Sequence, residues 1–115
     1  MMQLKQRCYK FSVEIINFIG LISDKKIYFS IIDQLIRSST SVGANIVEAR
    51  ASSSKKDFIR FYEIALKSSN ETGYWISLIK DTFLQNNERI SELKSENEEI
   101  SKIIAASILT MKKNL

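Results

Sequence analysis

The chain has 115 residues and a formal net charge of +4, and 44% of its residues are hydrophobic. This length fits one domain with one core, so we predict a single domain over residues 1–115, and the apolar fraction argues against a disordered chain. The chain holds no histidine, no proline and only three glycines, which argues against Ser-His-Asp or Cys-His catalysis, most zinc sites and a turn-rich sheet fold.

The first predicted helix runs from about Gln3 to Ile22. Its apolar residues recur every three or four positions, which is the pattern of one buried stripe on a helix. Cys8 falls within this stripe, so we interpret it as a small packed residue rather than a nucleophile. A short polar segment, 23–26, is the predicted first turn, and so short a connection implies an antiparallel neighbour. The stripe consists of Leu4, Cys8, Phe11, Ile15, Phe18, Ile19 and Ile22.

The second predicted helix covers roughly Tyr28 to Ala51. Its central stripe follows a strict four-three spacing. Gly43 sits in the middle of this helix, where glycine is less favourable than alanine by up to ~1 kcal/mol. We expect the close backbone approach of a neighbour, or a kink, to offset that loss. The stripe consists of Tyr28, Ile32, Leu35, Ser39, Val42, Ile46 and Ala49.

A polar row lies beside that stripe, about a quarter-turn away. Two interpretations fit it. In the first, which we favour, Asn45 and Arg37 form hydrogen bonds with Glu71 or Glu48 in a network that links helices. In the second, the row is a surface for an RNA, DNA or protein partner. The row consists of Gln34, Arg37, Ser41, Asn45 and Glu48.

The third predicted helix begins after a serine run, with Ser54 and Asp57 spaced as in a helix-capping box, and continues to about Leu84. Small residues occupy the middle of its stripe, as they do in the second helix. We therefore expect these two helices to pack closely there. The stripe consists of Phe58, Phe61, Ala65, Ser68, Thr72, Ile76, Ile79 and Phe83.

The segment 85–87 is the predicted last turn, and the fourth helix runs from about Glu88 to Lys113. Acidic residues lead this helix and two lysines close it, an order that suits the helix dipole. Four helices joined by three short turns predict an all-α fold, an antiparallel up-down-up-down four-helix bundle. The fourth stripe consists of Ile90, Leu93, Asn97, Ile100, Ile104, Ile108 and Met111.

Positive charge is concentrated in the first part of the chain. Residues 1–67 hold eleven Lys and Arg against six Asp and Glu, whereas residues 68–115 hold six against seven. Basic residues on the first and third helices are therefore candidates for contacting phosphate groups, although they also fit an ordinary solvated face. In an oligomer their field would add up around the symmetry axis. The candidate nucleic-acid-binding residues are Lys5, Arg7, Lys10, Lys55, Lys56, Arg60 and Lys67.

Cysteine content, hydropathy and motifs limit the class of function and the cellular location. One cysteine permits no internal disulfide, which favours a reducing, intracellular setting. Uncharged runs reach only about ten residues, against the ~20 that a membrane helix needs. No glycine-rich phosphate-binding motif is present. We therefore predict a cytoplasmic protein that is not an enzyme, with no catalytic residues, metal site, cofactor or membrane partner.

Two segments carry a resemblance to a known bacterial family. Gln34–Arg50 reads Q-x-x-R-S-x-x-S-V-x-x-N-I-V-E-A-R, and Asp57–Thr72 reads D-F-I-R-F-Y-E-I-A-L-K-S-S-N-E-T. This pattern resembles the four-helix bundle proteins encoded in 23S ribosomal RNA intervening sequences, a group that includes the accessory variability proteins of diversity-generating retroelements. The resemblance places the family's recurrent polar residues on Gln34, Arg37, Ser41, Asn45, Glu48, Ser68 and Glu71.

The resemblance also implies partners. The family pattern is a homo-oligomer, seen as a ring-shaped homopentamer, and in the retroelement branch a basic ring binds nucleic acid and a reverse transcriptase. The intervening-sequence branch implies no firm biochemical role. Our leading hypothesis is a homo-oligomer that binds RNA or DNA through basic side chains, with a reverse transcriptase or another nucleic-acid enzyme as a candidate partner. The alternative is a protein–protein scaffold whose basic face is incidental. Exposed Tyr62, Tyr74 or Trp75 would suit subunit contacts.

Overall fold

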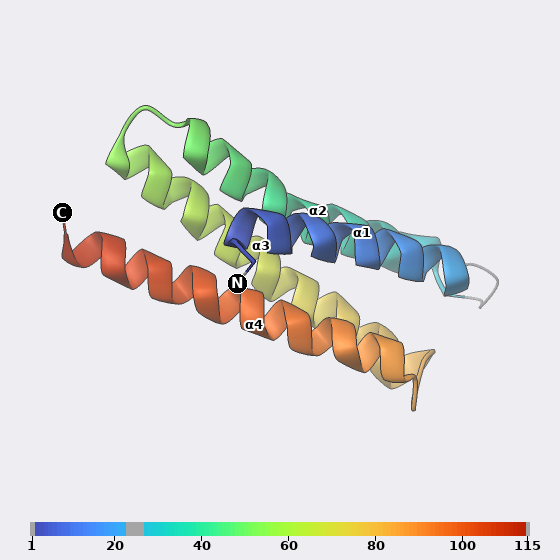
Figure 1. Ribbon diagram of the computed structural model, residues 1–115. Helices are drawn as coiled ribbons and strands as arrows, with labels where there is room; N and C mark the ends of the chain where they lie inside the picture. The colour runs from blue at the N-terminus through green and yellow to red at the C-terminus, as the bar shows by residue number, and fades with distance from the viewer. Residues whose placement is uncertain (1, 23–26, 115) are drawn as a thin grey trace.

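The computed structural model of the protein describes residues 2–22 and 27–114. Within them the chain forms four helices and no strand: α1 (Leu4–Ile22), α2 (Phe29–Ala51), α3 (Lys55–Thr82) and α4 (Glu88–Lys113). Neighbouring helices run antiparallel in a rod with extents of 48 × 23 × 20 Å (Figure 1). α1 and α3 each pack against both α2 and α4, so the all-α up-down-up-down bundle predicted from the sequence is confirmed.

Side-chain caps define the starts of α3 and α4. The Ser54 hydroxyl accepts a hydrogen bond from the backbone N–H of Asp57 at 3.1 Å, as predicted, and the Asn87 side chain accepts one from the Ile90 N–H at 3.0 Å. These bonds satisfy backbone donors that have no partner within the helix. α2 begins one residue later than predicted, after Tyr28, and α3 ends two residues earlier than predicted. The predicted turn at 23–26 lies outside the described residues.

The core is built from one stripe of each helix. The predicted stripes of α1 and α4 are buried along their length, with Leu4, Ile19 and Met111 packed at the edge. The stripes of α2 and α3 differ from the prediction at one end of the bundle, where Tyr28 is 69% and Phe83 37% exposed. These two rings lie at helix termini and pack edge to face on each other, with 5.9 Å between their centroids, rather than into the core.

The first turns of α3 also differ from the prediction. The buried residue there is Ile59, whereas Phe58 and Phe61 are half-buried. The cause is that α1 is the shortest helix and begins part-way along the bundle, so α2, α3 and α4 alone form the end near the C-terminus (Figure 1). At that end the Phe58 ring stacks on Tyr62 at 4.9 Å, and Tyr62 packs against the core.

Small polar side chains form the middle of the α2–α3 interface, as predicted. Thr72 donates a hydrogen bond to Ser38 at 3.0 Å, and Ser68 donates one to Ser41 at 2.9 Å. Because the side chains are small, the two backbones can approach each other, and the bonds satisfy hydroxyls that burial removes from water. This is the most extensive helix–helix interface in the bundle.

A second polar contact joins α3 to α4. Asn97 is 3% exposed; its side-chain N–H donates to the Ser69 carbonyl at 2.9 Å, and its side-chain oxygen accepts from the Ser69 hydroxyl at 3.1 Å. Ser101 also forms a hydrogen bond with the Ser69 hydroxyl. Among the residues that the structure describes, no buried side-chain nitrogen or oxygen lacks a partner. The polar layer through the middle of the bundle is therefore fully satisfied.

Gly43 lies where α1 comes close to α2. A Cβ on Gly43 would stand 3.3 Å from the Cβ of Cys8, which is tighter than ordinary van der Waals contact. The close backbone approach expected at this glycine is confirmed, and the neighbour is α1 rather than α3. Cys8 itself is 1% exposed, so it packs in the core as predicted.

Candidate nucleic-acid interface

One end of the bundle carries a net excess of positive charge. The turn between α2 and α3 meets the last turn of α4 there, because α4 runs antiparallel to α3. Lys55 donates a hydrogen bond to the backbone carbonyl of Asn114 at 2.8 Å, and Lys112 pairs with Glu63 at 2.9 Å. These contacts place cations of α3 and α4 together, and Arg50 lies in the last turn of α2, just before the same connection. We call this group the basic end; it consists of Arg50, Lys55, Lys56, Arg60, Lys112 and Lys113.

The charge excess of the basic end equals that of the whole chain. Residues 50–63 and 111–114 hold six Lys and Arg against two acidic residues, Asp57 and Glu63, an excess of four positive charges. The formal net charge of the chain is also +4, so the rest of the sequence is balanced. A local excess of one sign produces a field that attracts the phosphates of a nucleic acid.

The cations of the basic end differ in how they are held. Arg60 lies 3.7 Å from Asp57 and 4.6 Å from the centre of the Phe61 ring. Ion pairs between exposed side chains contribute only about 0–1 kcal/mol, so such a cation can exchange its carboxylate for a phosphate at little cost. Within the basic end, the exposed cations that form neither an ion pair nor a hydrogen bond with the described part of the chain are Arg50, Lys56 and Lys113.

The basic residues predicted from the sequence are only partly brought together. Arg7 is half-buried, and its guanidinium donates two hydrogen bonds of 2.8 Å to the Glu96 carboxylate of α4. This hydrogen bonding raises the pKa of Arg7, and the guanidinium is engaged within the bundle. Lys5 and Lys10 are exposed on α1, a helix that begins part-way along the rod (Figure 1). The three exposed cations on one face of α3 are Lys56, Arg60 and Lys67.

The polar row of α2 forms different hydrogen bonds from those predicted. Asn45 donates to the backbone carbonyl of Ser41 at 2.8 Å and to its hydroxyl at 3.0 Å, within the same helix, rather than to Glu48 or Glu71. The link between helices is instead the hydroxyl pair of Ser41 and Ser68. A short amide reaches the preceding turn of its own helix more easily than a carboxylate across the interface.

Three members of that row face solvent. Gln34, Arg37 and Glu48 are exposed, and Arg37 forms no ion pair within residues 2–22 and 27–114. Glu71, also exposed, accepts a hydrogen bond from the Trp75 indole at 3.1 Å. The favoured interpretation was therefore wrong for Arg37 and for the partners of Asn45. A partner-binding role for the exposed members stays a prediction.

The chemistry of Cys8 is that of a packed side chain. Burial raises the pKa of its thiol to about 12, so the thiol is protonated near neutral pH and is a poor nucleophile. The described residues contain no group of three or more His, Cys, Asp or Glu placed to hold a metal ion. None of the helices in the described ranges has the length and apolarity to cross a membrane.

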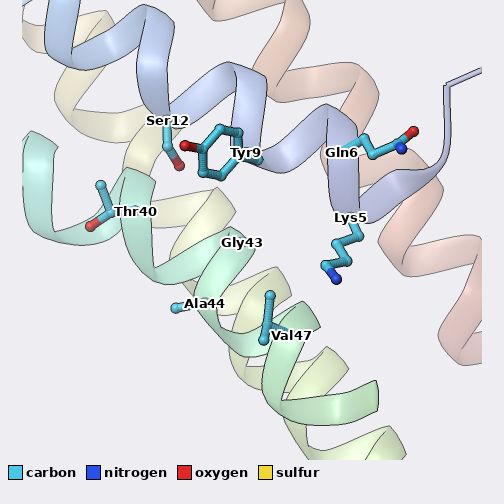
Figure 2. Close-up of a pocket in the computed structure, with 8 residues that line it drawn as sticks. All are labelled: Lys5, Gln6, Tyr9, Ser12, Thr40, Gly43, Ala44 and Val47. Atoms are coloured by element: carbon cyan, nitrogen blue, oxygen red, sulfur yellow. The ribbon is translucent and has the colours of Figure 1, made fainter. Parts of the chain in front are cut away.

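A groove of about 390 Å³ lies between the outer sides of α1 and α2. Figure 2 shows Tyr9 and Lys5 extending from α1, opposite the small side chains of α2 and the bare backbone of Gly43. Val47 closes the groove on the α2 side. The groove was not predicted from the sequence, because Tyr9 and Val47 fall outside the buried stripes, although the helical spacing of these exposed apolar residues was available as a signal.

The fold and these surfaces can now be compared with known proteins. The chain matches the model of a family described as 23S rRNA-intervening sequence protein over residues 1–106. The chain belongs to this family. The resemblance seen in the sequence rests on residues 34–72, and the family match covers nearly the whole of this intervening-sequence protein.

A solved structure shares the fold. It is a protein of unknown function from the S23 ribosomal protein family of Bacteroides thetaiotaomicron, 35% identical in sequence, with a TM-score of 0.86 over 92% of this chain and 98% of that chain. A search of curated proteins gives no match. The family and the fold are thus shown, and the function has to be argued from the surfaces of the bundle.

Proposed function

We propose that this intervening-sequence protein is a cytoplasmic, self-associating protein without enzymatic activity that binds RNA or DNA through its basic end. The concentration of the whole positive excess at that end carries the proposal. Lysine and arginine side chains on a protein surface bind nucleic acid by neutralising phosphates and releasing counterions. The assignment of the solved neighbour to an S23 ribosomal protein family is in keeping with an RNA ligand.

Self-association would strengthen binding through the basic end. An excess of four charges on one bundle supports weak binding only, because each phosphate contact is screened by salt. Several copies bring several basic ends into one assembly, so a long nucleic acid contacts more than one of them and dissociates more slowly. The resemblance to ring-shaped homopentamers supports such an assembly.

The alternative function is a protein–protein scaffold or adaptor. One observation favours it: the groove between α1 and α2 and its surroundings are largely apolar, which suits a protein surface better than a phosphate backbone. A reverse transcriptase or another nucleic-acid enzyme is a candidate partner under both functions. The two functions differ in their response to salt, because phosphate binding weakens steeply as salt rises and apolar contact does not.

Fluorescence anisotropy with a labelled, structured RNA and with a DNA duplex of the same length tests the proposal. The test variant replaces three exposed cations of the basic end, Lys56→Gln, Arg60→Gln and Lys113→Gln. The matched control variant removes the same charge elsewhere, on α3 and α4, and carries Lys80→Gln, Lys94→Gln and Lys102→Gln.

We expect wild-type binding to weaken with rising salt. In the test variant we expect affinity to fall at least about tenfold and the slope of log affinity against log salt to decrease by about 2–3, since each lost phosphate contact removes ~0.9 from the slope. The control variant should keep most of the affinity. Equal losses in the two variants would show attraction to overall charge rather than to the basic end, and wild-type protein that binds neither nucleic acid would favour the scaffold.

A further inference from the structure

The pairing of α1 with α4 shows how far α1 reaches toward the basic end. Arg7 of α1 pairs with Glu96 of α4, and Glu14 pairs with Arg89. Each step toward the start of α1 is therefore matched by a step toward the end of α4. Because α1 begins at Leu4, the last turns of α4 extend past the beginning of α1 (Figure 1).

A groove of about 540 Å³ lies between α3 and these last turns of α4. Ile103, Ser107 and Thr110 follow Glu96 at steps of seven, four and three residues, so they continue the side of α4 that faces α1 further along the rod. Beyond the beginning of α1 this side is left open. We call the site the open-end groove; its lining includes Phe58, Tyr62, Ile103, Ser107, Thr110 and Met111.

Two stacked aromatic rings form the α3 side of the open-end groove. The rings of Phe58 and Tyr62 lie 4.9 Å apart at their centroids, with 21° between their planes. Tyr62 packs against the core, so it supports one face of the Phe58 ring. Phe58 is half-buried and has no second ring partner among the described residues. A ring held in this way is a platform on which a further planar ring can stack.

Positive charge borders the same groove. Burial raises the pKa of the Tyr62 hydroxyl, and the positive charge of Arg50 opposes that rise, which places the exposed guanidinium of α2 near this ring. Lys55 lies three residues before Phe58, on the same side of α3, and donates to the Asn114 carbonyl at 2.8 Å. Among the described residues, no acidic side chain lines the groove. Two cations of the basic end therefore stand beside an aromatic platform.

We propose that the open-end groove binds an unpaired nucleobase of a single-stranded nucleic acid, which stacks on Phe58 while Arg50 and Lys55 contact the adjacent phosphates. The proposal rests on the nucleic-acid binding in the proposed function and names the form of the ligand. Bases inside a duplex are stacked on their neighbours and present no free face, whereas unpaired bases stack on aromatic side chains of proteins.

The mixture of groups in the groove favours a base over an apolar protein segment. A nucleotide has an apolar ring face, a polar ring edge and a phosphate, and the groove offers a counterpart to each. The Phe58 ring meets the face, and the two cations meet the phosphates. The exposed Thr110 hydroxyl, which forms no hydrogen bond with another described residue, meets the edge. An apolar side chain would use only the ring.

Fluorescence anisotropy with labelled single strands of about twelve nucleotides, within the ~4–16 that single-strand sites cover, tests the proposal. One strand is oligoadenylate RNA and one is its deoxyribose equivalent. The third strand has the same phosphates as the RNA, with stable abasic units in place of the bases. The test variant, Phe58→Leu, removes the ring and keeps an apolar side chain. Phe83→Leu is the matched control, because Phe83 also packs on a tyrosine, Tyr28, at the opposite end of the bundle. Circular dichroism establishes that both variants keep their helices.

We expect wild-type protein to bind at least one base-bearing strand at least about fivefold more tightly than the abasic strand at the same salt, the gain from one stacked base. Phe58→Leu should lose this preference and keep the wild-type affinity for the abasic strand. Its salt dependence should be unchanged, because no phosphate contact is lost. Phe83→Leu should behave as wild type. A preference for the ribose or the deoxyribose strand identifies the source of the base.

Equal wild-type affinity for the base-bearing and abasic strands would overturn the proposal without recourse to any variant, and so would an equal loss of preference in Phe58→Leu and Phe83→Leu. Failure here is distinguishable from failure of the proposed function. If bases add nothing while the variant with three cations of the basic end replaced loses affinity for every strand, the groove proposal fails and phosphate binding stands. If that variant binds the abasic strand as wild type does while Phe58→Leu loses the preference for bases, the basic end fails and the groove stands.

Discussion

α1 and α3 occupy opposite corners of the bundle and are held in place by different kinds of contact. α3 is joined to both neighbours by hydrogen bonds of small buried groups, Thr72 with Ser38 of α2 and Ser69 with Asn97 of α4. α1 is held by its buried apolar stripe, and its further contacts are the close approach to Gly43 of α2 and partly exposed ion pairs to α4. Buried polar contacts are costly to break, whereas partly exposed ion pairs contribute little.

This difference concerns the polar contacts, because all four helices contribute a buried stripe to the core. Satisfied polar groups fix the register of α2, α3 and α4. The polar contacts of α1 are its partly exposed ion pairs to α4. We therefore expect substitutions at the contacts of α3 to reduce global stability, and substitutions at the contacts of α1 to act mainly on that helix.

The largest effect is expected at the α3–α4 contact. Asn97→Ala removes an amide that is 3% exposed and leaves the Ser69 hydroxyl with fewer partners. The lost bonds and the small cavity together should lower the free energy of unfolding by about 3 kcal/mol, measured by urea denaturation at fixed protein concentration. Asn70→Ala, at an exposed position on α3, is the control and should change stability by less than about 0.5 kcal/mol. Similar losses in the two variants would contradict the structural role of the polar layer.

A smaller effect is expected where α1 meets α2. Gly43→Leu introduces a side chain whose Cβ already stands 3.3 Å from the Cβ of Cys8, so α1 must move outward. Overpacking of this kind costs about 1–3 kcal/mol, partly offset by the better helix propensity of leucine, about 1 kcal/mol. We expect a net loss of about 1–2 kcal/mol and faster hydrogen exchange in α1 than in α3.

Gly20→Leu is the matched control for that substitution. A Cβ at Gly20 meets no atom of the described residues within 4 Å, so the gain in helix propensity should outweigh any steric cost, and stability should rise by about 0.5–1 kcal/mol. The two glycines therefore predict changes of opposite sign for the same substitution in neighbouring helices. If both variants lose stability equally, close approach at Gly43 is not what attaches α1.

The fold could be predicted from the sequence because each helix repeats one apolar stripe at helical spacing, and the turns are short. The prediction failed at the ends of the stripes, such as Tyr28 and Phe58, because helical spacing does not reveal where a neighbouring helix stops. The shorter α1 leaves Phe58 half-buried. Burial at the end of a bundle depends on the relative lengths of the helices. The spacing of apolar residues within one helix gives no information about the lengths of its neighbours.

The surfaces were harder to predict than the fold. Lys55, Lys56 and Arg60 were candidates from sequence. Lys112 and Lys113 were not, because they join the basic end only when α4 folds back along α3, and Arg50, in the last turn of α2, was not singled out either. The polar row of α2 was recognised from the sequence, but the hydrogen-bond partners of Asn45 were not. Asn45 bonds to Ser41, one turn earlier in the same helix. The groove between α1 and α2 was not predicted, because the residues that line it fall outside the buried stripe of each helix.

The smallest expected effect concerns the ion pair that ties α1 to α4. The guanidinium of Arg7 binds the Glu96 carboxylate in a bidentate geometry, and each side chain is 29% exposed. A double-mutant cycle with Arg7→Gln and Glu96→Gln should give a coupling energy of about 0.5–1 kcal/mol, the upper range for partly exposed pairs. In 1 M salt the coupling should fall, because the pair remains accessible to screening ions.

Lys102 and Glu99 of α4 supply the control cycle. Their charged atoms are 3.7 Å apart and their side chains are 75% and 55% exposed, so their coupling should be close to zero. A coupling for Arg7 and Glu96 of 3 kcal/mol or more, of the size measured when buried pairs are broken, would place α1 among the strongly held helices and remove the contrast with α3. A small, salt-sensitive coupling would instead show that the buried apolar stripe of α1, and not its ion pairs, holds this helix in the bundle.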